Sequence, residues 1–375
     1  MSPARPEPAP VAKILGWPEA TPAGGPVAEL PAKPLGGLKD GTGEELLAEL
    51  VGRPKSERIS LLRSDRRLQT SAVLRSLIER SLEQAILDPG LEEDLARLAL
   101  DLARILTGSA AALPLEDLRA CAWASVGNAR RLRFDFTGAD EAFEKAFSHL
   151  RRGAAEPESR ALVLRLLASL RGDQRRLVDA LRLLEQALDL LEEAGDIPGT
   201  VLLLVKISAL YEQGGRPEPA LEALRKALER FDSNSEDFRL LLHLKHNLAT
   251  NLAGAGRFAE AAETLAGIGD LYNRFPDPWT RNRRTWLEAR ISRGMGDPGR
   301  AESLFLAARQ GFFAQGSAYD AALVSLELAS LYTEQGKTAD VTRIAVEIFP
   351  IFSSQRIDRE ARATLALLDL TPTPV

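Results

Sequence analysis

The chain has 375 residues and a formal net charge of −5, with 45% hydrophobic and only 6% aromatic residues. This charge gives no general attraction to phosphate backbones or anionic membranes, so nucleic acid and membrane partners are not expected. No run of 18 apolar residues is present to span a bilayer, and residues 1–30 lack the apolar core of a signal peptide. The single cysteine, Cys121, excludes an internal disulfide and is expected to be a small core residue. Together these features predict a cytoplasmic protein.

Residues 1–42 carry nine of the 22 prolines and are predicted to be a disordered tail. Within them, Val11, Ile14, Leu15 and Trp17 form a short apolar string. This string could dock on a partner or on the protein's own groove, or it could simply belong to an unstructured tail.

Helical order is expected to begin near Thr42, where a Thr followed three residues later by Glu45 resembles a capping box. Apolar spacing predicts further helices at residues 71–87 and 91–106. Residues 43–114 are therefore predicted to form an N-terminal helical cap and an atypical first repeat.

Beyond residue 115 small residues recur at a fixed period. One set lies 40 or 41 residues apart: Ala139, Ala180, Ala220, Ala261 and Ala301, followed by Val341. Twelve residues before each of these lies a second small residue: Gly127, Ala168, Ser208, Ala249, Ala289 and Ala329. Helices that cross closely cannot place bulk on both sides of the contact, so this pattern predicts paired helices. Gly215, Gly256, Gly296 and Gly336 lie five residues before the small residue, where the turns are expected.

The stretch from Trp123 to Ala146 resembles the tetratricopeptide repeat, because it has that family's residue types at that family's spacing: Trp123, Val126, Gly127, Ala139, Phe143 and Ala146. The repeat is stretched from 34 to about 40 residues, which is similar to the sensor solenoids of bacterial maltose-type transcription regulators and to kinesin light chains. The resemblance implies an all-α, right-handed solenoid of about seven antiparallel helix pairs. Six extended repeats are expected at 115–357, with a capping helix and a frayed end at 358–375.

No motif for nucleotide binding, metal binding or nucleophilic catalysis is present, so no enzyme, catalytic residue, cofactor or metal is expected. His243 and His246 lie one helical turn apart, but no third ligand of a suitable type is nearby in sequence. Arg63, Arg66 and Arg67 form a small basic cluster without a recognition helix after it, which does not favour DNA binding.

The resemblance also implies that the first helices of successive repeats line a concave groove. Projection from the small residues predicts that the solvent-facing groove positions are Asn128, Arg131, Arg165, Lys206, His243, His246, Asn247, Arg283, Trp286 and Arg290. Such a basic, amide-rich wall suits a carboxylate, an acidic peptide or a phosphate. The alternative is that these arginines form salt bridges between neighbouring repeats.

The sequence thus predicts a non-enzymatic scaffold, adaptor or regulator that binds another protein or an acidic peptide. The alternative function is a small-anion or signal-peptide sensing module of a bacterial transcription-regulatory system. If the groove interpretation is right, changing Arg165 and Arg290 to Glu should weaken partner binding and leave stability almost unchanged. Oligomeric state is not predicted.

Overall fold

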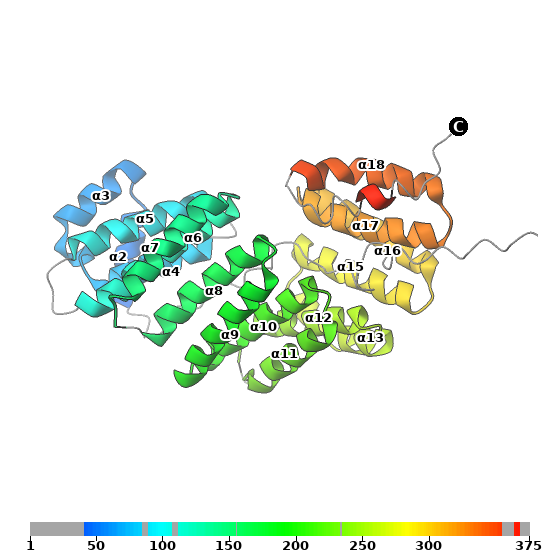
Figure 1. Ribbon diagram of the computed structural model, residues 1–375, viewed down its shortest axis with the longest axis horizontal. Helices are drawn as coiled ribbons and strands as arrows, with labels where there is room; N and C mark the ends of the chain where they lie inside the picture. The colour runs from blue at the N-terminus through cyan, green and yellow to red at the C-terminus, as the bar shows by residue number, and fades with distance from the viewer. Residues whose placement is uncertain are drawn as a thin grey trace, which may run out of the picture. The chain divides into compact units, whose positions relative to one another are not determined.

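The protein is described here from a computed structural model that covers residues 41–84, 89–106, 112–154, 156–232, 235–354 and 364–367. Within these ranges all regular structure is helical (Figure 1). The described residues up to Leu210 form one compact unit, and those from Tyr211 onward form a second. No helix in the described ranges is both long enough and apolar enough to cross a lipid bilayer.

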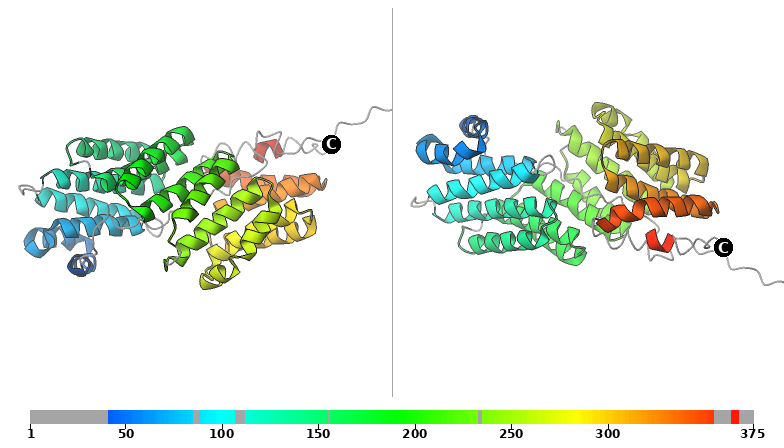
Figure 2. Two further views of the ribbon diagram at one scale, coloured as in Figure 1. Left: turned by 90° about the horizontal axis from the view of Figure 1, so that it is seen from below. Right: turned by 90° about the horizontal axis from the view of Figure 1, so that it is seen from above.

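The first unit is a stack of helix pairs in which consecutive helices pack side by side (Figure 2). Its helices are α2 (Gly41–Val51), α3 (Lys55–Ser64), α4 (Ser71–Gln84), α5 (Pro89–Ile105), α6 (Ala112–Leu132), α7 (Phe136–Leu150), α8 (Pro157–Asp173), α9 (Leu177–Glu193) and most of α10 (Ile197–Gln213), with a 3-10 turn, η1, at Arg66–Leu68. The helices predicted at 71–87 and 91–106 are confirmed as α4 and α5.

The second unit repeats the same arrangement. Its helices are α11 (Pro217–Arg230), α12 (Phe238–Gly254), α13 (Phe258–Ala266), α14 (Gly269–Arg274), α15 (Pro278–Gly294), α16 (Pro298–Ala314), α17 (Ala318–Glu334) and α18 (Thr338–Ser354). The short helical stretch 364–367 follows, and Leu367 is buried in one core with Ile348 and Phe352 of α18.

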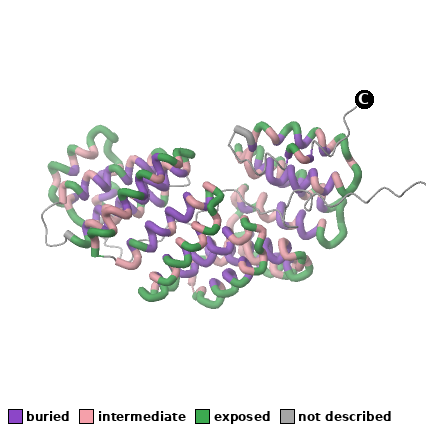
Figure 3. Tube along the Cα trace, viewed as in Figure 1, coloured by how far each residue is buried: buried purple, intermediate pink, exposed green. Residues whose placement is uncertain are grey.

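The small residues that define the repeat lie where the helices of each pair touch. Ala139, Ala180, Ala220, Ala261 and Ala301 have no exposed surface, and Val341 is only 3% exposed. Gly127 lies against Phe143 so closely that a Cβ atom would be 2.9 Å from Cε2 of that ring. Figure 3 shows buried, intermediate and exposed residues interspersed along most of the helices. The predicted all-α fold of paired helices is confirmed.

The turns between paired helices use a left-handed backbone conformation. Gly215, Gly256, Gly296 and Gly336 have φ between 68° and 83°. The turns before Ala139 and Ala180 contain no glycine, yet Phe134 and Arg175 at the same offset adopt φ values of 61° and 60°. Left-handed backbone is strained for residues with a Cβ, by roughly 1–2 kcal/mol. The packing of the pair therefore fixes the turn even where the local sequence disfavours it.

The tail predicted at 1–42 lies almost wholly outside the described residues, as does most of the predicted end at 358–375. The proposed domain boundaries at 42, 114 and 357 therefore stay predictions. Cys121 is fully buried, and burial raises the pKa of its thiol to about 12, which agrees with a packed core residue.

Candidate functional site

In the first unit the predicted groove residues Asn128 and Arg131 belong to a buried polar network. Asn128 Nδ2 donates to Glu92 Oε1 of α5 at 2.9 Å, and Arg131 Nε donates to Asn128 Oδ1 at 3.0 Å. Arg131 Nη1 also pairs with Asp173 Oδ2 of α8 at 2.6 Å. Asn128 has no exposed surface and Arg131 is 3% exposed, so the expectation that they face solvent is wrong. The network joins α5, α6 and α8, and so links three successive helix pairs.

The other two predicted residues of the first unit, Arg165 and Lys206, differ in their burial. Lys206 of α10 is 9% exposed, because that helix is buried over most of its circumference. Arg165 of α8 is half-buried. The expectation that Lys206 faces solvent is therefore wrong, whereas the assignment of Arg165 to the groove stays a prediction.

The second unit brings the remaining six predicted residues together. His243, His246 and Asn247 project from α12, while Arg283, Trp286 and Arg290 project from α15, and the two helices are in contact. Asn247 Oδ1 accepts a hydrogen bond from Arg283 Nη2 at 3.5 Å. These six residues therefore lie on two neighbouring helices, and their role as groove residues stays a prediction.

Within this region Trp286 and Arg290 are structural. Both reach the buried carboxylate of Glu327 on α17: Trp286 Nε1 donates to Oε1 at 3.2 Å, and Arg290 Nε lies 3.5 Å from Oε2. The Trp286 ring also packs edge-on against Phe312. Trp286 is 4% exposed and Arg290 9%, so neither is the solvent-facing groove residue that projection predicts.

The remaining residues form what we call the Arg283 cluster, defined as His243, Asn247, Trp279 and Arg283. The guanidinium of half-buried Arg283 lies over the Trp279 ring, 4.9 Å from its centroid, and the His243 ring lies 6.4 Å from that ring. Among the described residues no carboxylate oxygen lies within 4.0 Å of the Arg283 guanidinium. Desolvation lowers the pKa of Arg283, although the more distant carboxylates of Glu212 and Asp320 act in the opposite direction. The cluster therefore contains a desolvated cation that, within the described part of the chain, donates a hydrogen bond to a neutral amide.

The two histidines of the region are neutral at physiological pH. Burial, together with the positive charges of Arg283 and Arg239, lowers the pKa of His243 to about 3. Burial and the same Arg283 charge lower the pKa of His246 well below its ordinary value, and His246 Nδ1 shares a 2.5 Å hydrogen bond with the Tyr272 hydroxyl. The predicted basic character of this wall therefore comes from arginine alone.

These depressed pKa values predict acid sensitivity. Below the unfolded pKa of about 6.5, the unfolded chain binds protons at these histidines that the folded chain does not, so stability falls as the pH drops from 6.5 towards 3. Between pH 6.5 and 5 the free energy of unfolding should fall by about 1–2 kcal/mol per histidine. Denaturant titrations at both pH values, on the parent and on His243→Asn, measure this. An unchanged pH dependence in the variant would show that His243 is protonated while folded.

Projection from the sequence missed Trp279, the aromatic residue beneath Arg283. A usable signal was present, because Trp279 lies four residues before Arg283 on α15 and residues four apart are neighbours on a helix. Among the described residues no group of three or more His, Cys, Asp or Glu side chains is placed to hold a metal ion.

Comparison with known proteins agrees with this architecture. Residues 159–233 match the family model for the tetratricopeptide repeat. No curated protein matches the chain. A solved structure of a Rap protein complexed with competence and sporulation factor is similar with a TM-score of 0.65 at 13% identity, over 80% of this chain and 82% of that one. The apo form of RapI is similar with a TM-score of 0.54 at 13% identity, over 89% and 98% of the two chains.

A third similar structure is a signal transduction ATPase with a tetratricopeptide repeat sensor from Pyrococcus horikoshii. Its TM-score is 0.52 at 14% identity, over 85% of this chain and 50% of that one. At these identities the similarities establish a shared fold. The family match identifies residues 159–233 as a tetratricopeptide-repeat segment, and the similar structures show that the described chain shares their helical-repeat fold.

Proposed function

We propose that this protein is a non-enzymatic scaffold that binds a protein or peptide partner, and that an acidic group of the partner binds Arg283. The observation that carries the proposal is the Arg283 cluster, where a half-buried guanidinium has no carboxylate within ion-pairing distance among the described residues. Burying a charge without a partner of opposite sign is costly, and a bound anion would remove that cost.

The chemistry of the cluster favours a single carboxylate. A planar guanidinium matches the two oxygens of a carboxylate. The Arg283 guanidinium also packs on the Trp279 ring, which restricts its orientation. The neighbouring cations already form ion pairs: Arg239 Nη1 lies 3.5 Å from Asp277 Oδ2, and Arg290 Nε lies 3.5 Å from Glu327 Oε2. His243 is neutral and adds no charge. One available positive charge suits an aspartate, glutamate or terminal carboxylate better than a multiply charged phosphate.

The similar structures support a binding role of this kind. The Rap protein was solved with competence and sporulation factor bound, and the ATPase carries its repeats as a sensor. A sensing module that binds a free small anion at Arg283 is therefore the second candidate function. For either role we propose a cytoplasmic location, on the basis of the single, buried cysteine.

Capture from lysate with the Arg283→Met variant tests the binding site. Loss of the guanidinium should abolish or strongly reduce recovery of the partner, whereas Arg281→Met should not. Arg281 is the matched control because it is an exposed arginine on the same helix. Quantitative mass spectrometry of the captured proteins measures the difference.

Equal recovery with both variants would contradict the proposal. Melting temperatures of the two variants, measured in parallel, must stay close to that of the parent for the comparison to be valid. If a small carboxylic acid raises the melting temperature of the parent but not of Arg283→Met, and no macromolecule is captured, the sensing role is favoured instead.

A further inference from the structure

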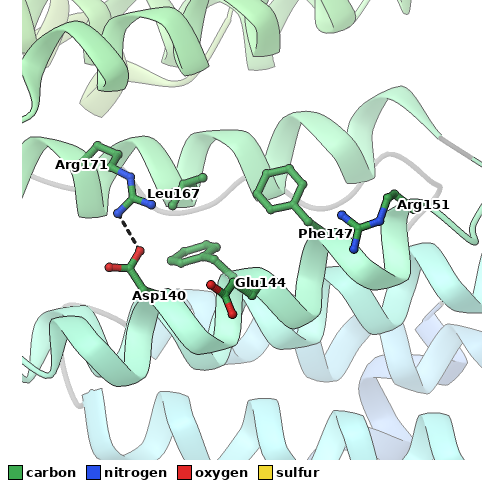
Figure 4. A pocket seen from close by; sticks show the side chains of 7 residues that line it. Asp140, Glu144, Phe147, Arg151, Leu167 and Arg171 are labelled. Atoms are coloured by element: carbon green, nitrogen blue, oxygen red, sulfur yellow. Dashed lines mark hydrogen bonds and ion pairs between the residues drawn. The ribbon is translucent and has the colours of Figure 1, made fainter.

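The first unit contains an open pocket of about 750 Å³ between α7 and α8, distant in sequence from the Arg283 cluster (Figure 4). We call it the α7–α8 pocket and define it by the residues that line it: Asp140, Phe143, Glu144, Phe147, Arg151, Leu167 and Arg171. Its volume lies within the range of sites that hold peptide side chains or small ligands.

The floor of the α7–α8 pocket is apolar. Phe143 and Leu167 are buried, and Phe147 is half-buried and reaches into the space between the two helices (Figure 4). At one end of the pocket Arg171 Nη1 forms an ion pair with Asp140 Oδ1 at 2.6 Å, which links α8 to α7. An aromatic floor of this size favours an occupant with large apolar side chains.

Two exposed charges on the rim have no ion pair among the described residues: Glu144 and Arg151. Glu144 lies on α7 and Arg151 is the residue that caps its C-terminal end, seven positions on, which places them about two turns apart, or about 10 Å along the helix axis. Phe147 lies between them in sequence. The pocket is therefore complementary to a segment that has a basic residue, then an apolar core, then an acidic residue.

The N-terminal part of the chain contains such a segment at residues 11–19, Val-Ala-Lys-Ile-Leu-Gly-Trp-Pro-Glu. Lys13 precedes the apolar residues Ile14, Leu15 and Trp17, and Glu19 follows them. This is the order of charges that Glu144 and Arg151 would select. The segment lies outside the described residues. Its docking is therefore inferred from its sequence, its charges and the length of chain that separates it from α2.

The length of the intervening chain allows the contact. From Trp17 to the start of α2 at Gly41 there are 24 residues, which can span up to about 80 Å. Within the same unit α2 contacts α4, α4 contacts α6, and α6 contacts α7. Packed helices lie about 8–10 Å apart, so three such steps are well within reach.

We propose that residues 11–19 dock in the α7–α8 pocket of the same chain, with Trp17 against Phe147, Lys13 beside Glu144 and Glu19 beside Arg151. This contact is independent of Arg283 and of any partner bound there. It covers the aromatic floor with a segment of the protein itself, so that a partner for this face would have to displace it.

Fluorine NMR on the full-length protein containing 5-fluorotryptophan tests the docking. A nitroxide is attached at Ser148→Cys, one turn beyond Glu144 on α7, and buried Cys121 is protected from labelling. The Trp17 resonance, assigned by Trp17→Phe, should be broadened several-fold relative to a diamagnetic label. Trp123 is the internal positive reference, because its ring lies under Lys145 of α7.

Exchanging the two charges of the proposed Lys13–Glu144 pair then tests how residues 11–19 are aligned along α7. Glu144→Lys should restore a sharp Trp17 resonance, and combining it with Lys13→Glu should broaden that resonance again. Glu141→Lys is the matched control, since Glu141 is an exposed carboxylate on α7 that does not line the pocket. The proposal would be overturned if the Trp17 line width were the same with the nitroxide as with the diamagnetic label. It would also be overturned if Glu141→Lys and Glu144→Lys changed that line width equally. Broadening that disappears on dilution would assign the contact to a second copy and overturn it as well.

Discussion

Arg290→Glu is expected to destabilise the second unit by about 3–5 kcal/mol, which is the effect of breaking a buried ion pair by removing one partner. The variant would place two carboxylates against each other, because Arg290 Nε lies 3.5 Å from Glu327 Oε2 and both residues are at least nine-tenths buried. Denaturant unfolding followed by tryptophan fluorescence measures the loss. This result would replace the sequence-based expectation that reversal of Arg290 leaves stability unchanged.

Two further variants separate the ion pair from simple packing. Arg281→Glu reverses an exposed charge on the same helix and should change stability by no more than about 0.5 kcal/mol. Arg290→Met combined with Glu327→Gln removes both charges but keeps an acceptor for Trp286 Nε1, so much of the stability should return. Similar unfolding curves for Arg290→Glu and Arg281→Glu would show that Arg290 is not a structural residue.

Gly127→Leu should destabilise the first unit by about 1–3 kcal/mol, because it adds volume to a contact that has no space for it. A Cβ atom at this position would lie 2.9–3.2 Å from three atoms of the Phe143 ring, which is itself only 2% exposed. The buried ring has little freedom to move away. Thermal or denaturant unfolding of the variant measures the cost.

Compensation at Phe143 provides the control for this prediction. Gly127→Ala combined with Phe143→Leu should unfold closer to the parent than Gly127→Ala alone, because the shorter side chain vacates the space that the new methyl group needs. If Gly127→Leu unfolded like the parent, the helices of this pair would not meet at Gly127 and the repeat register would be wrong.

The architecture could be predicted from the sequence because one geometric requirement recurs in every repeat. Close helix crossing demands small residues at fixed offsets, and the structure places Ala139, Ala180 and their successors at the crossings. The left-handed turns at Phe134 and Arg175 were not predictable from residue type, since neither residue favours that conformation. There the packed pair, rather than the local sequence, determines the turn.

The exposure of the site residues could not be predicted by projecting single helices. Whether an arginine is free or paired depends on a residue about one repeat away: Arg131 pairs with Asp173, 42 residues on, and Trp286 bonds Glu327, 41 residues on. The residue 41 positions after Arg283 is Val324, which is uncharged and cannot form an ion pair. The partner of Arg290, Glu327, lies 37 residues on, so a single fixed offset would not have separated Arg283 from every structural arginine.

The most direct test of the proposed function is isothermal titration calorimetry of the captured partner with the parent protein, Arg283→Met and Arg281→Met. Losing a charge-assisted hydrogen bond of about 1.5–3 kcal/mol should weaken binding to Arg283→Met by roughly 10- to 100-fold. Arg281→Met should bind like the parent. Equal affinities for the parent and Arg283→Met would contradict the assignment of Arg283 as the residue that binds the partner's carboxylate.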